Sequence, residues 1–306
     1  MKRSPSHDGE AQASSSVPPI CDYEDSSYRT DFWEGQGREY EDRAERFALR
    51  RLLPPSGRRL LDIGAGFGRL ASIYRGYDEV ILLDYSQSQL EYARSRLGDE
   101  GFTYVAADIY RLPLAPNVVD AAVMVRVLHH IADVPSALGR VRRALGPRST
   151  FILEFANKRH LKNILRFLVG RGVNPFARQP YEFAPLHYDF HPAWVEEQLE
   201  RAGFDVRERL SISLFRADLL KRTFSPSLLA RMDAALQGIA APLTLGPSVF
   251  LRTTLKKTGE RLSVAPKEIF SCPQCECAPL ERVEGGLLCP RCDTLWPMEN
   301  GVYIFK

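Results

Sequence analysis

Three glycines at alternate positions follow a short apolar run that contains an acid, and this pattern is suited to holding a ligand against the main chain. The residues are Leu60, Leu61, Asp62, Ile63, Gly64, Gly66 and Gly68. Glycine adopts positive φ at no steric cost, and the first turn of a helix offers free N–H groups. The pattern predicts a strand that turns sharply into a helix beside a nucleotide-like cofactor; the alternative is an ordinary tight turn. A dinucleotide-binding turn has its third glycine one place later, where this chain has Arg69.

A second acid lies 20 residues beyond Gly64, at the end of another apolar run. Residues 79–84 predict a buried strand that ends at Asp84, and Ser86 with Gln89 forms a capping box that would open a helix. A carboxylate at this position can accept hydrogen bonds from both hydroxyls of a ribose, which supports a ligand that contains adenosine. The alternative is that Asp84 caps the following helix.

Two Cys-x-x-Cys pairs near the C-terminus have the spacing of a metal site. Cys272 and Cys275 form the first pair, and Cys289 and Cys292 form the second. Four thiolates suit tetrahedral Zn²⁺, and the metal would be structural because the protein supplies all four ligands. About 35 residues bury too little apolar surface to fold alone, so the metal would supply about 10 kcal/mol or more of their folding free energy. A redox dithiol is disfavoured. Cys277 could replace Cys275 as a metal ligand, but the regular Cys-x-x-Cys spacing disfavours this.

The segment after Asp84 carries further motifs in a specific order. They are a predicted strand over 102–107, Asp108-Ile109, Leu-Pro-Leu over 112–114, a predicted strand over 120–125 and Val-Leu-His-His over 127–130. With the glycine motif, this order resembles the type-11 family of class I S-adenosylmethionine (SAM) methyltransferases. The resemblance implies an α/β fold with a Rossmann-like, seven-stranded, mostly parallel sheet whose last strand is antiparallel.

The resemblance also implies which residues hold the cofactor. The expected cofactor-binding residues are Asp62, Gly64, Gly66, Gly68, Asp84, Asp108, Ile109 and Arg126. The glycines would pass close to the methionine part of SAM, and Asp84 would hold the ribose. Asp108 would contact the adenine amino group while Ile109 packs on the ring, and Arg126 would border the methionine part. His129 and His130 are frequent in the family without a general catalytic role and are expected to be structural.

Further predicted elements would position these residues. Helical spacing of apolar residues over 40–52 indicates a helix ahead of the first strand. Trp33 and Tyr40 would line the cofactor pocket or, in the favoured alternative, anchor this helix to the sheet. Gly-Pro-Arg at 146–148 would form a turn where the family usually has Pro-Gly-Gly. The other predictions are a helix capped by Asp133, a strand over 149–154, a helix over 192–202 and strands over 204–212 and 248–255.

Two insertions, 156–190 and 213–246, exceed a minimal methyltransferase core. The first begins with basic and apolar residues and has no acid up to Gly172. Such a stretch could contact a membrane surface, RNA or an acidic substrate, although a solvated helix face is favoured. Its second half is rich in polar and aromatic residues and would build the acceptor pocket, where His187, Tyr188 and His191 are the candidates for a general base. The second insertion would cap the same edge of the sheet or form an interface helix.

The C-terminal region resembles the small zinc-ribbon activators of methyltransferases. The resemblance rests on the cysteine pairs and on the sequence from Leu295 to Val302, in which Asn300-Gly301 predicts a hairpin. Those activators act on separate methyltransferases through contact with a strand edge. A fused copy implies the same stabilisation within one chain.

Composition bounds the remaining possibilities. With 306 residues, 44% of them apolar, the chain is long enough for one large domain and a small one. A formal charge of +3 argues against a surface built mainly to hold nucleic acid. Lys2 and Arg3 precede no apolar signal segment, and no apolar run approaches the roughly 20 residues that span a bilayer. A cytoplasmic location is the expectation.

The expected layout is a disordered tail (1–20), a methyltransferase domain (21–257), a linker (258–270) and a zinc ribbon (271–306). The expected function is transfer of a methyl group from SAM to a small-molecule or lipid-like acceptor, with peripheral membrane contact an open alternative. An rRNA or tRNA methyltransferase is the rival enzyme, and a non-catalytic SAM-binding partner protein is the rival from another class. Salt-dependent binding of RNA would favour the first rival.

Overall fold

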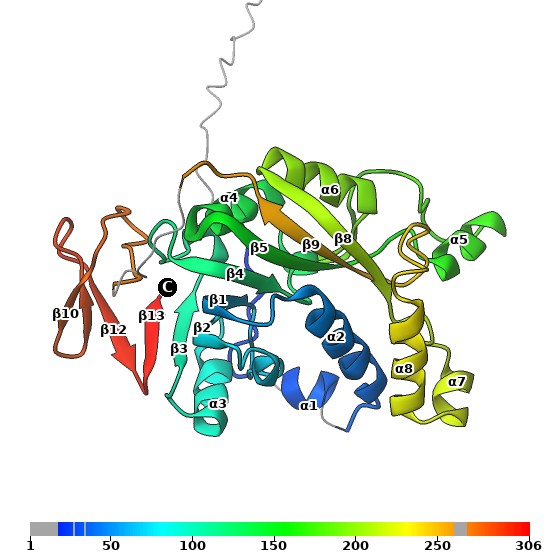
Figure 1. The fold of residues 1–306 in the computed structure, drawn as a ribbon, viewed down its shortest axis with the longest axis horizontal. Coiled ribbons are helices and arrows are strands. Elements are labelled where there is room, and N and C mark those ends of the chain that lie inside the picture. The colour runs from blue at the N-terminus through cyan, green and yellow to red at the C-terminus, as the bar shows by residue number, and fades with distance from the viewer. Residues whose placement is uncertain (1–17, 27, 34, 260–267) are drawn as a thin grey trace, which may run out of the picture.

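A twisted sheet with helices packed on both faces forms the body of the molecule (Figure 1). The structure is a computed structural model of the chain and describes residues 18–26, 28–33, 35–259 and 268–306. The tail predicted over 1–20 lies mostly outside the described residues, and so does most of the linker predicted over 258–270. Within the described ranges, no helix is long and apolar enough to cross a bilayer.

Among the described residues, seven strands make up the sheet before the C-terminal ribbon joins it. They are β1 (Gly57–Ile63), β2 (Tyr77–Asp84), β3 (Phe102–Ala107), β4 (Val119–Met124), β5 (Leu145–Ala156), β8 (Phe204–Ile212) and β9 (Ser248–Leu255). Their order is β3-β2-β1-β4-β5-β9-β8. The first five run parallel to one another, and β9 runs antiparallel to both of its neighbours. The mostly parallel sheet with an antiparallel last strand is confirmed.

Continuous apolar runs place these strands in the interior, because a parallel sheet is covered on both faces. In β1, consecutive residues Leu60 and Leu61 point to opposite faces, and both are fully buried. Leu61 packs in one core cluster and Leu60 in the other. The covering helices and short helical turns are α1 (Tyr28–Phe32), α2 (Glu39–Leu52), η1 (Ala71–Ile73), α3 (Gln87–Leu97), η2 (Ile109–Arg111), η3 (Leu128–His130), α4 (Val134–Ala144) and α6 (Pro192–Arg201).

The helix predicted directly after the glycine motif is absent from this described segment, so that prediction is wrong. Turns and the three-residue 3₁₀ helix η1 follow β1 instead. Gly64, Gly66 and Gly68 have φ of 72°, 51° and 72°, in the left-handed region that interrupts an α-helix. The turn predicted at 146–148 also differs, because these residues belong to an irregular start of β5, where the register with β4 shifts.

The two insertions form additional helices and a hairpin. The first contains α5 (Leu161–Leu168) and the hairpin of β6 (Tyr181–Ala184) and β7 (His187–Asp189), and the second contains α7 (Asp218–Thr223) and α8 (Pro226–Leu236). Helix α8 packs on α2 through Tyr40, whose hydroxyl donates to Asp233 Oδ1 at 3.1 Å. The Tyr40 hydroxyl also accepts the N–H of Phe215 at 2.9 Å. Tyr40 therefore anchors α2 to the second insertion.

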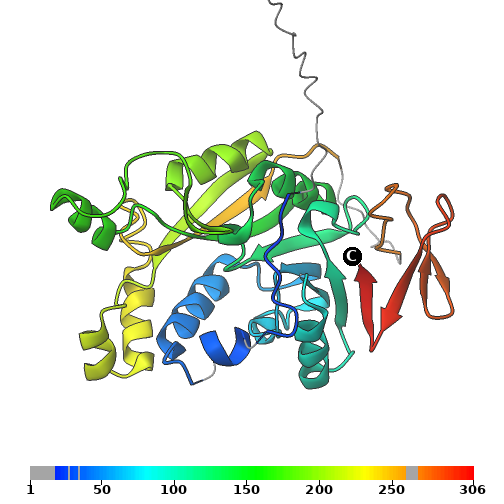
Figure 2. The same ribbon diagram turned by 180° about the vertical axis from the view of Figure 1, so that it is seen from behind.

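The C-terminal ribbon continues the main sheet. Its strands are β10 (Glu281–Val283), β11 (Gly286–Leu288), β12 (Leu295–Glu299) and β13 (Val302–Phe305). β13 pairs in parallel with β3, with Val302 opposite Tyr104 and Phe305 opposite Ala107. Asn300 and Gly301 have φ of 49° and 76° in the turn between β12 and β13, which confirms the predicted hairpin. Seen from behind, the ribbon lies at one end of the sheet and α5, α7 and α8 lie at the other (Figure 2).

Candidate active site

A cavity opens at the carboxyl ends of β1, β2 and β4, where open α/β sheets bind their ligands. The glycine turn after β1 borders it, and its walls also come from η2 and from the described segment 18–26. The lining residues include Gly64, Gly66, Asp84, Ile109, Arg126 and His130. All of these except His130 are residues that the sequence predicts for a cofactor site. The fold therefore brings together predicted residues that lie far apart in the chain.

The Asp84 carboxylate fixes the glycine turn. Its Oδ2 accepts the N–H of Gly66 at 2.7 Å, and its Oδ1 accepts the N–H of Ser86 at 2.9 Å. Burial raises the pKa of Asp84. Ser86, rather than Asp84, caps α3 by accepting the N–H of Gln89. The carboxylate thus lines the cavity while two main-chain donors hold its orientation.

Two of the glycines are required for different reasons. A Cβ on Gly64 would lie 2.1 Å from Cγ2 of Val127, so the segment after β4 and the turn can approach one another only because Gly64 has no side chain. A Cβ on Gly68 would lie 2.8 Å from Cδ1 of Leu97 in α3. Gly68 therefore permits packing on α3, whereas Gly64 and Gly66 line the cavity.

Asp108 and Ile109 lie at the start of η2. Ile109 lines the cavity. Asp108 Oδ1 accepts the N–H of Tyr110 at 2.8 Å and so caps this turn. The Tyr110 hydroxyl in turn accepts the N–H of Asp133 at 3.0 Å. The position of the acid is therefore fixed by hydrogen bonds, and its predicted contact with adenine remains a prediction.

A smaller hollow adjoins the cavity on the side of the glycine turn. Its lining includes Trp33, Asp62, Gly64, Phe67 and Arg126. The guanidinium carbon of Arg69 lies 3.8 Å from the centre of the Trp33 ring, and that of Arg126 lies 4.9 Å from it. Trp33 therefore lines a pocket, whereas Tyr40 is buried against Asp233.

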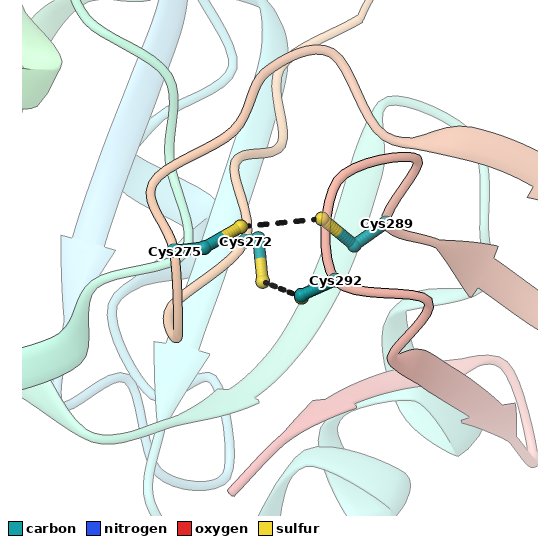
Figure 3. Close-up of side chains that lie close together, drawn as sticks. All are labelled: Cys272, Cys275, Cys289 and Cys292. Carbon is teal, nitrogen blue, oxygen red and sulfur yellow. Dashed lines mark hydrogen bonds between the residues drawn. The ribbon is translucent and has the colours of Figure 1, made fainter.

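The four predicted cysteines come together in the ribbon (Figure 3). The sulfurs of Cys272 and Cys292 are 3.6 Å apart, those of Cys275 and Cys289 are 3.4 Å apart, and all four lie within 4.8 Å of one another. Four thiolates around Zn²⁺ at about 2.3 Å would be separated by about 3.8 Å. The donor set and its spacing therefore fit a tetrahedral zinc ion. Cys277 lies outside this group of sulfurs and accepts the N–H of Cys272 with its main-chain oxygen.

Comparison with known proteins indicates the same chemistry. The family model described as "Methyltransferase domain" matches residues 61–153, which contain the glycine turn, Asp84 and Arg126. The demethylmenaquinone methyltransferase of Chlamydia pneumoniae is 30% identical over 179 residues, which cover 54% of this chain and 78% of that protein. This chain belongs to the class I SAM-dependent methyltransferase family.

Other known proteins resemble a smaller part of this methyltransferase or have a lower sequence identity to it. Methyltransferase AacuQ of Aspergillus aculeatus is 38% identical over 92 residues, or 29% of each chain. The chain spans only about 30% of the length of the first two curated relatives that it matches. A chain from the Haloferax volcanii complex of a methyltransferase activator with a methyltransferase is 19% identical with a TM-score of 0.52, covering 76% of this chain and 98% of that one. At this identity the likeness shows the fold alone.

A buried ion-pair network beside the hollow is a feature that sequence reasoning missed. Glu45 of α2 accepts from Arg126 Nε at 2.7 Å with one carboxylate oxygen and from Arg69 Nη2 at 2.7 Å with the other. Burial alone would raise the pKa of Glu45, but the two guanidinium groups outweigh it and hold the pKa at about 2. The sequence signal that could have revealed the network is an acid, Glu45, directly after Ala44 on the face of α2 that carries the apolar residues. The network fixes the methyltransferase's α2 against the glycine turn.

Arg126 occupies a strained position in this network. Its φ is 61°, which is uncommon for a residue with a side chain. Its main-chain N–H donates to Glu154 at the end of β5 at 2.7 Å, while its side chain reaches Glu45. The chain therefore leaves β4 with a turn that directs Arg126 toward the hollow.

Three imidazoles lie together between the cavity and the hairpin β6–β7. The His130 ring is 3.9 Å from that of His129 and 4.7 Å from that of His187. His130 bonds the Tyr23 hydroxyl through Nε2 at 3.2 Å and the Leu186 main-chain oxygen through Nδ1 at 3.0 Å. Burial lowers the pKa of His130 to about 4 and that of His129 well below its usual range, so both are neutral at pH 7. His130 thus joins segment 18–26 to the hairpin.

The three candidates for a general base are separated in the structure. His187 packs on His130 and so lies beside the cavity. Tyr188 packs near Phe190, with ring centres 6.2 Å apart. His191 caps α6, because its Nδ1 accepts the N–H of Ala193 at 3.2 Å. A catalytic role for any of them remains a prediction, and the geometry favours His187.

The last residue of the ribbon contacts the wall of the cavity. Lys306 Nζ donates to Glu24 Oε2 at 2.9 Å and to the main-chain oxygen of Tyr85 at 3.0 Å. Glu24 also accepts the N–H groups of Gln87 and Ser88, each at 2.8 Å. Both Tyr85 and segment 18–26 line the cavity. The ribbon is therefore linked to the site by side-chain contacts in addition to the pairing of β13 with β3.

Lys306→Ala is expected to weaken binding of S-adenosylhomocysteine (SAH) about threefold, because a partly exposed ion pair contributes up to about 1 kcal/mol. Titration calorimetry measures this change. Arg282→Ala is the matched control, since Arg282 donates to the Tyr303 hydroxyl within the ribbon and lies away from segment 18–26. An equal loss of affinity in both variants would show that the effect is a general property of the ribbon.

Proposed function

We propose that this methyltransferase transfers a methyl group from SAM to a small, lipid-like acceptor. The observation that carries the proposal is the character of the acceptor side of the cavity. The neutral imidazole of His130 lines it, the neutral imidazole of His129 packs on His130, and the hairpin places Phe183 beside His187, with ring centres 5.8 Å apart. Such a surface favours an apolar or aromatic acceptor. Relatives named as demethylmenaquinone and ubiquinone/menaquinone methyltransferases support the same class.

The geometry of the cavity supports the proposed cofactor contacts. Asp84 would hold the ribose, Ile109 and Asp108 the adenine, and the turn at Gly64 and Gly66 the methionine part beside Asp62, Gly68 and Arg126. These residues fit SAM because a buried carboxylate and a glycine turn without side chains lie together at the strand ends. When bound, SAM supplies an already activated methyl group on sulfur. The protein's task is then to position the acceptor in line and to exclude water, which Trp33 and Tyr23 serve by covering the site.

The proposal predicts where a labelled methyl group goes. Zinc-loaded protein would be incubated with methyl-labelled SAM and, in parallel, with a lipid extract, prenylated quinols, small phenols or total RNA. We expect label in the organic-phase or small-molecule fraction, at a rate that His187→Ala lowers more than Tyr188→Phe. Label in RNA alone would overturn the proposal in favour of the RNA methyltransferase. Tight SAH binding with no transfer to any acceptor would favour the non-catalytic partner protein.

We further propose the layout predicted from the sequence, with a methyltransferase domain over 21–257, a linker over 258–270 and a ribbon over 271–306 that binds Zn²⁺. The grouping of the four sulfurs supports the metal. In the reducing cytoplasm, which is the location we propose, these thiols stay available to the metal.

Binding of SAH is expected to weaken as the pH falls from about 8 to about 6. Burial raises the pKa of Asp62 to about 7, so this residue loses its negative charge in that range. We propose that the ionised carboxylate attracts the amino group of the methionine part, which makes the affinity fall up to about tenfold per pH unit below the pKa. Calorimetry at three pH values measures the slope.

Asp62→Asn serves as the control, because it keeps the shape and removes the titration. The variant should bind weakly at every pH, and an equal slope in both proteins would contradict the proposal. The sign for stability is opposite. Without ligand, the raised pKa of Asp62 stabilises the folded protein, and this contribution is complete below about pH 4. It is lost as the pH rises from about 4 through about 7. Asp62→Asn should therefore gain stability relative to wild type between about pH 4 and pH 7.

A further inference from the structure

Helix α5 (Leu161–Leu168) extends from the body of the molecule at the end opposite the ribbon (Figures 1 and 2). None of its residues is buried. Leu161, Leu165 and Leu168 are 47%, 55% and 70% exposed, although leucine is a residue that normally lies inside. The i, i+4 and i+7 spacing puts these three side chains on one face of the helix. The helix thus presents an apolar stripe to solvent.

Basic side chains flank this stripe on the helix and also occur in the following loop. Lys162 and Arg166 lie on the helix, and Arg171 and Arg178 follow it. No acid occurs between Glu154 and Glu182. Within the described part of the chain, none of these four basic side chains forms an ion pair. The segment therefore combines an apolar stripe with positive charge that no described acid neutralises.

A second exposed apolar segment lies beside the start of α5. The N–H of Leu161 donates to the main-chain oxygen of Leu245 at 3.0 Å, which joins α5 to the loop after α8. In that loop Ile239 is 73% exposed and Leu243 is 59% exposed. We call α5 together with loop 239–243 the apolar-basic patch. Because α5 follows the carboxyl end of β5, the patch lies at the edge of the sheet where the cofactor cavity opens.

We infer that the apolar-basic patch docks the enzyme on the surface of an anionic bilayer. A helix with an apolar face and a Lys/Arg-rich polar face lies in the interface of such a membrane, where the apolar side chains leave water and the basic ones meet anionic headgroups. RNA would use the positive charge but would leave the leucines in water. The inference goes beyond the proposed function and does not depend on it, because it concerns a surface and its test requires no acceptor.

The test is co-sedimentation of the zinc-loaded full chain with vesicles of phosphatidylcholine alone or with about 30% phosphatidylglycerol, at physiological salt. We expect at least about tenfold stronger binding to the anionic vesicles. Leu165→Glu/Leu168→Glu and Lys162→Glu/Arg166→Glu should each lower that binding about tenfold or more. Arg75→Glu/Arg96→Glu is the charge-matched control, since both residues are exposed and lie on other elements. Unchanged SAH affinity would show that the variants are folded.

Several results would overturn the inference. Folded wild-type protein that stays in the supernatant with anionic vesicles would do so. Equal loss of binding in the Arg75→Glu/Arg96→Glu control would show that total charge, rather than the patch, is responsible. A dimer that dissociates on Leu165→Glu/Leu168→Glu without any vesicle binding would assign the patch to a second copy of the chain. Binding to RNA but not to vesicles would assign it to nucleic acid.

Discussion

Asp84→Ala is expected to weaken binding of SAH about 100-fold or more. The variant removes the carboxylate that we propose for the ribose, and it also leaves the N–H groups of Gly66 and Ser86 without their acceptor. Hydrogen bonds to a charged group contribute about 1.5–3 kcal/mol each, and loss of two of them to the ribose corresponds to this factor or more. Titration calorimetry with SAH, on zinc-loaded protein, measures it directly.

A second carboxylate of the same sheet provides the control. Asp120 Oδ2 accepts the N–H groups of Arg58 at 2.9 Å and Arg59 at 3.1 Å, at the end of β1 away from the cavity. Asp120→Ala should lower the melting temperature and leave the affinity for SAH within about twofold, because only main-chain packing changes. If Asp84→Ala binds SAH as tightly as Asp120→Ala does, the ribose is held elsewhere and the proposed cofactor contacts are wrong.

Local patterns account for what the sequence predicted correctly. The apolar runs that end at Asp84 and Ala107 form β2 and β3. A strand that is buried on both faces has apolar residues at consecutive positions, so it can be recognised from the local sequence. The caps of α3 by Ser86 and of α4 by Asp133 were also predictable, since a cap and its helix are neighbours in the chain. The clustering of the four cysteines could likewise be predicted from their spacing alone. The helix predicted after Gly64 is absent because three glycines at alternate positions, Gly64, Gly66 and Gly68, adopt positive φ and interrupt it.

Long-range contacts account for what was missed. Glu45 and Arg126 are 81 residues apart, and only the packing of α2 against the end of β4 brings them together. Tyr23 reaches His130 across 107 residues, so nothing local marks segment 18–26 as a wall of the cavity. The separation of His187 from His191 depends on where β7 ends and α6 begins. In the sequence these residues were only a cluster of polar and aromatic side chains.

Removing the zinc that we propose for the ribbon is expected to unfold the ribbon and to destabilise the whole protein. The ribbon's own core is small, so zinc would supply about 10 kcal/mol or more of its folding free energy. When the ribbon unfolds, β13 leaves β3 and exposes Val302 and Phe305, which are now fully or almost fully buried. Each large apolar side chain contributes about 1.5–3 kcal/mol, so the methyltransferase domain should melt about 10 °C lower. Thermal denaturation before and after treatment with a strong chelator measures the difference.

Cysteine variants distinguish loss of the metal from side effects of the chelator. Cys289→Ser removes a buried ligand of the proposed zinc and should abolish binding of about one zinc per chain, with the same fall in melting temperature. Cys277→Ser is the matched control, because its sulfur lies outside the four-sulfur group and the variant should keep both the metal and the melting temperature. Because Lys306 and β13 both act through the folded ribbon, SAH affinity should fall further in Cys289→Ser than in Lys306→Ala. Deletion of residues 260–306 with unchanged melting temperature and SAH affinity would show that the ribbon does not stabilise the enzyme to which it is fused.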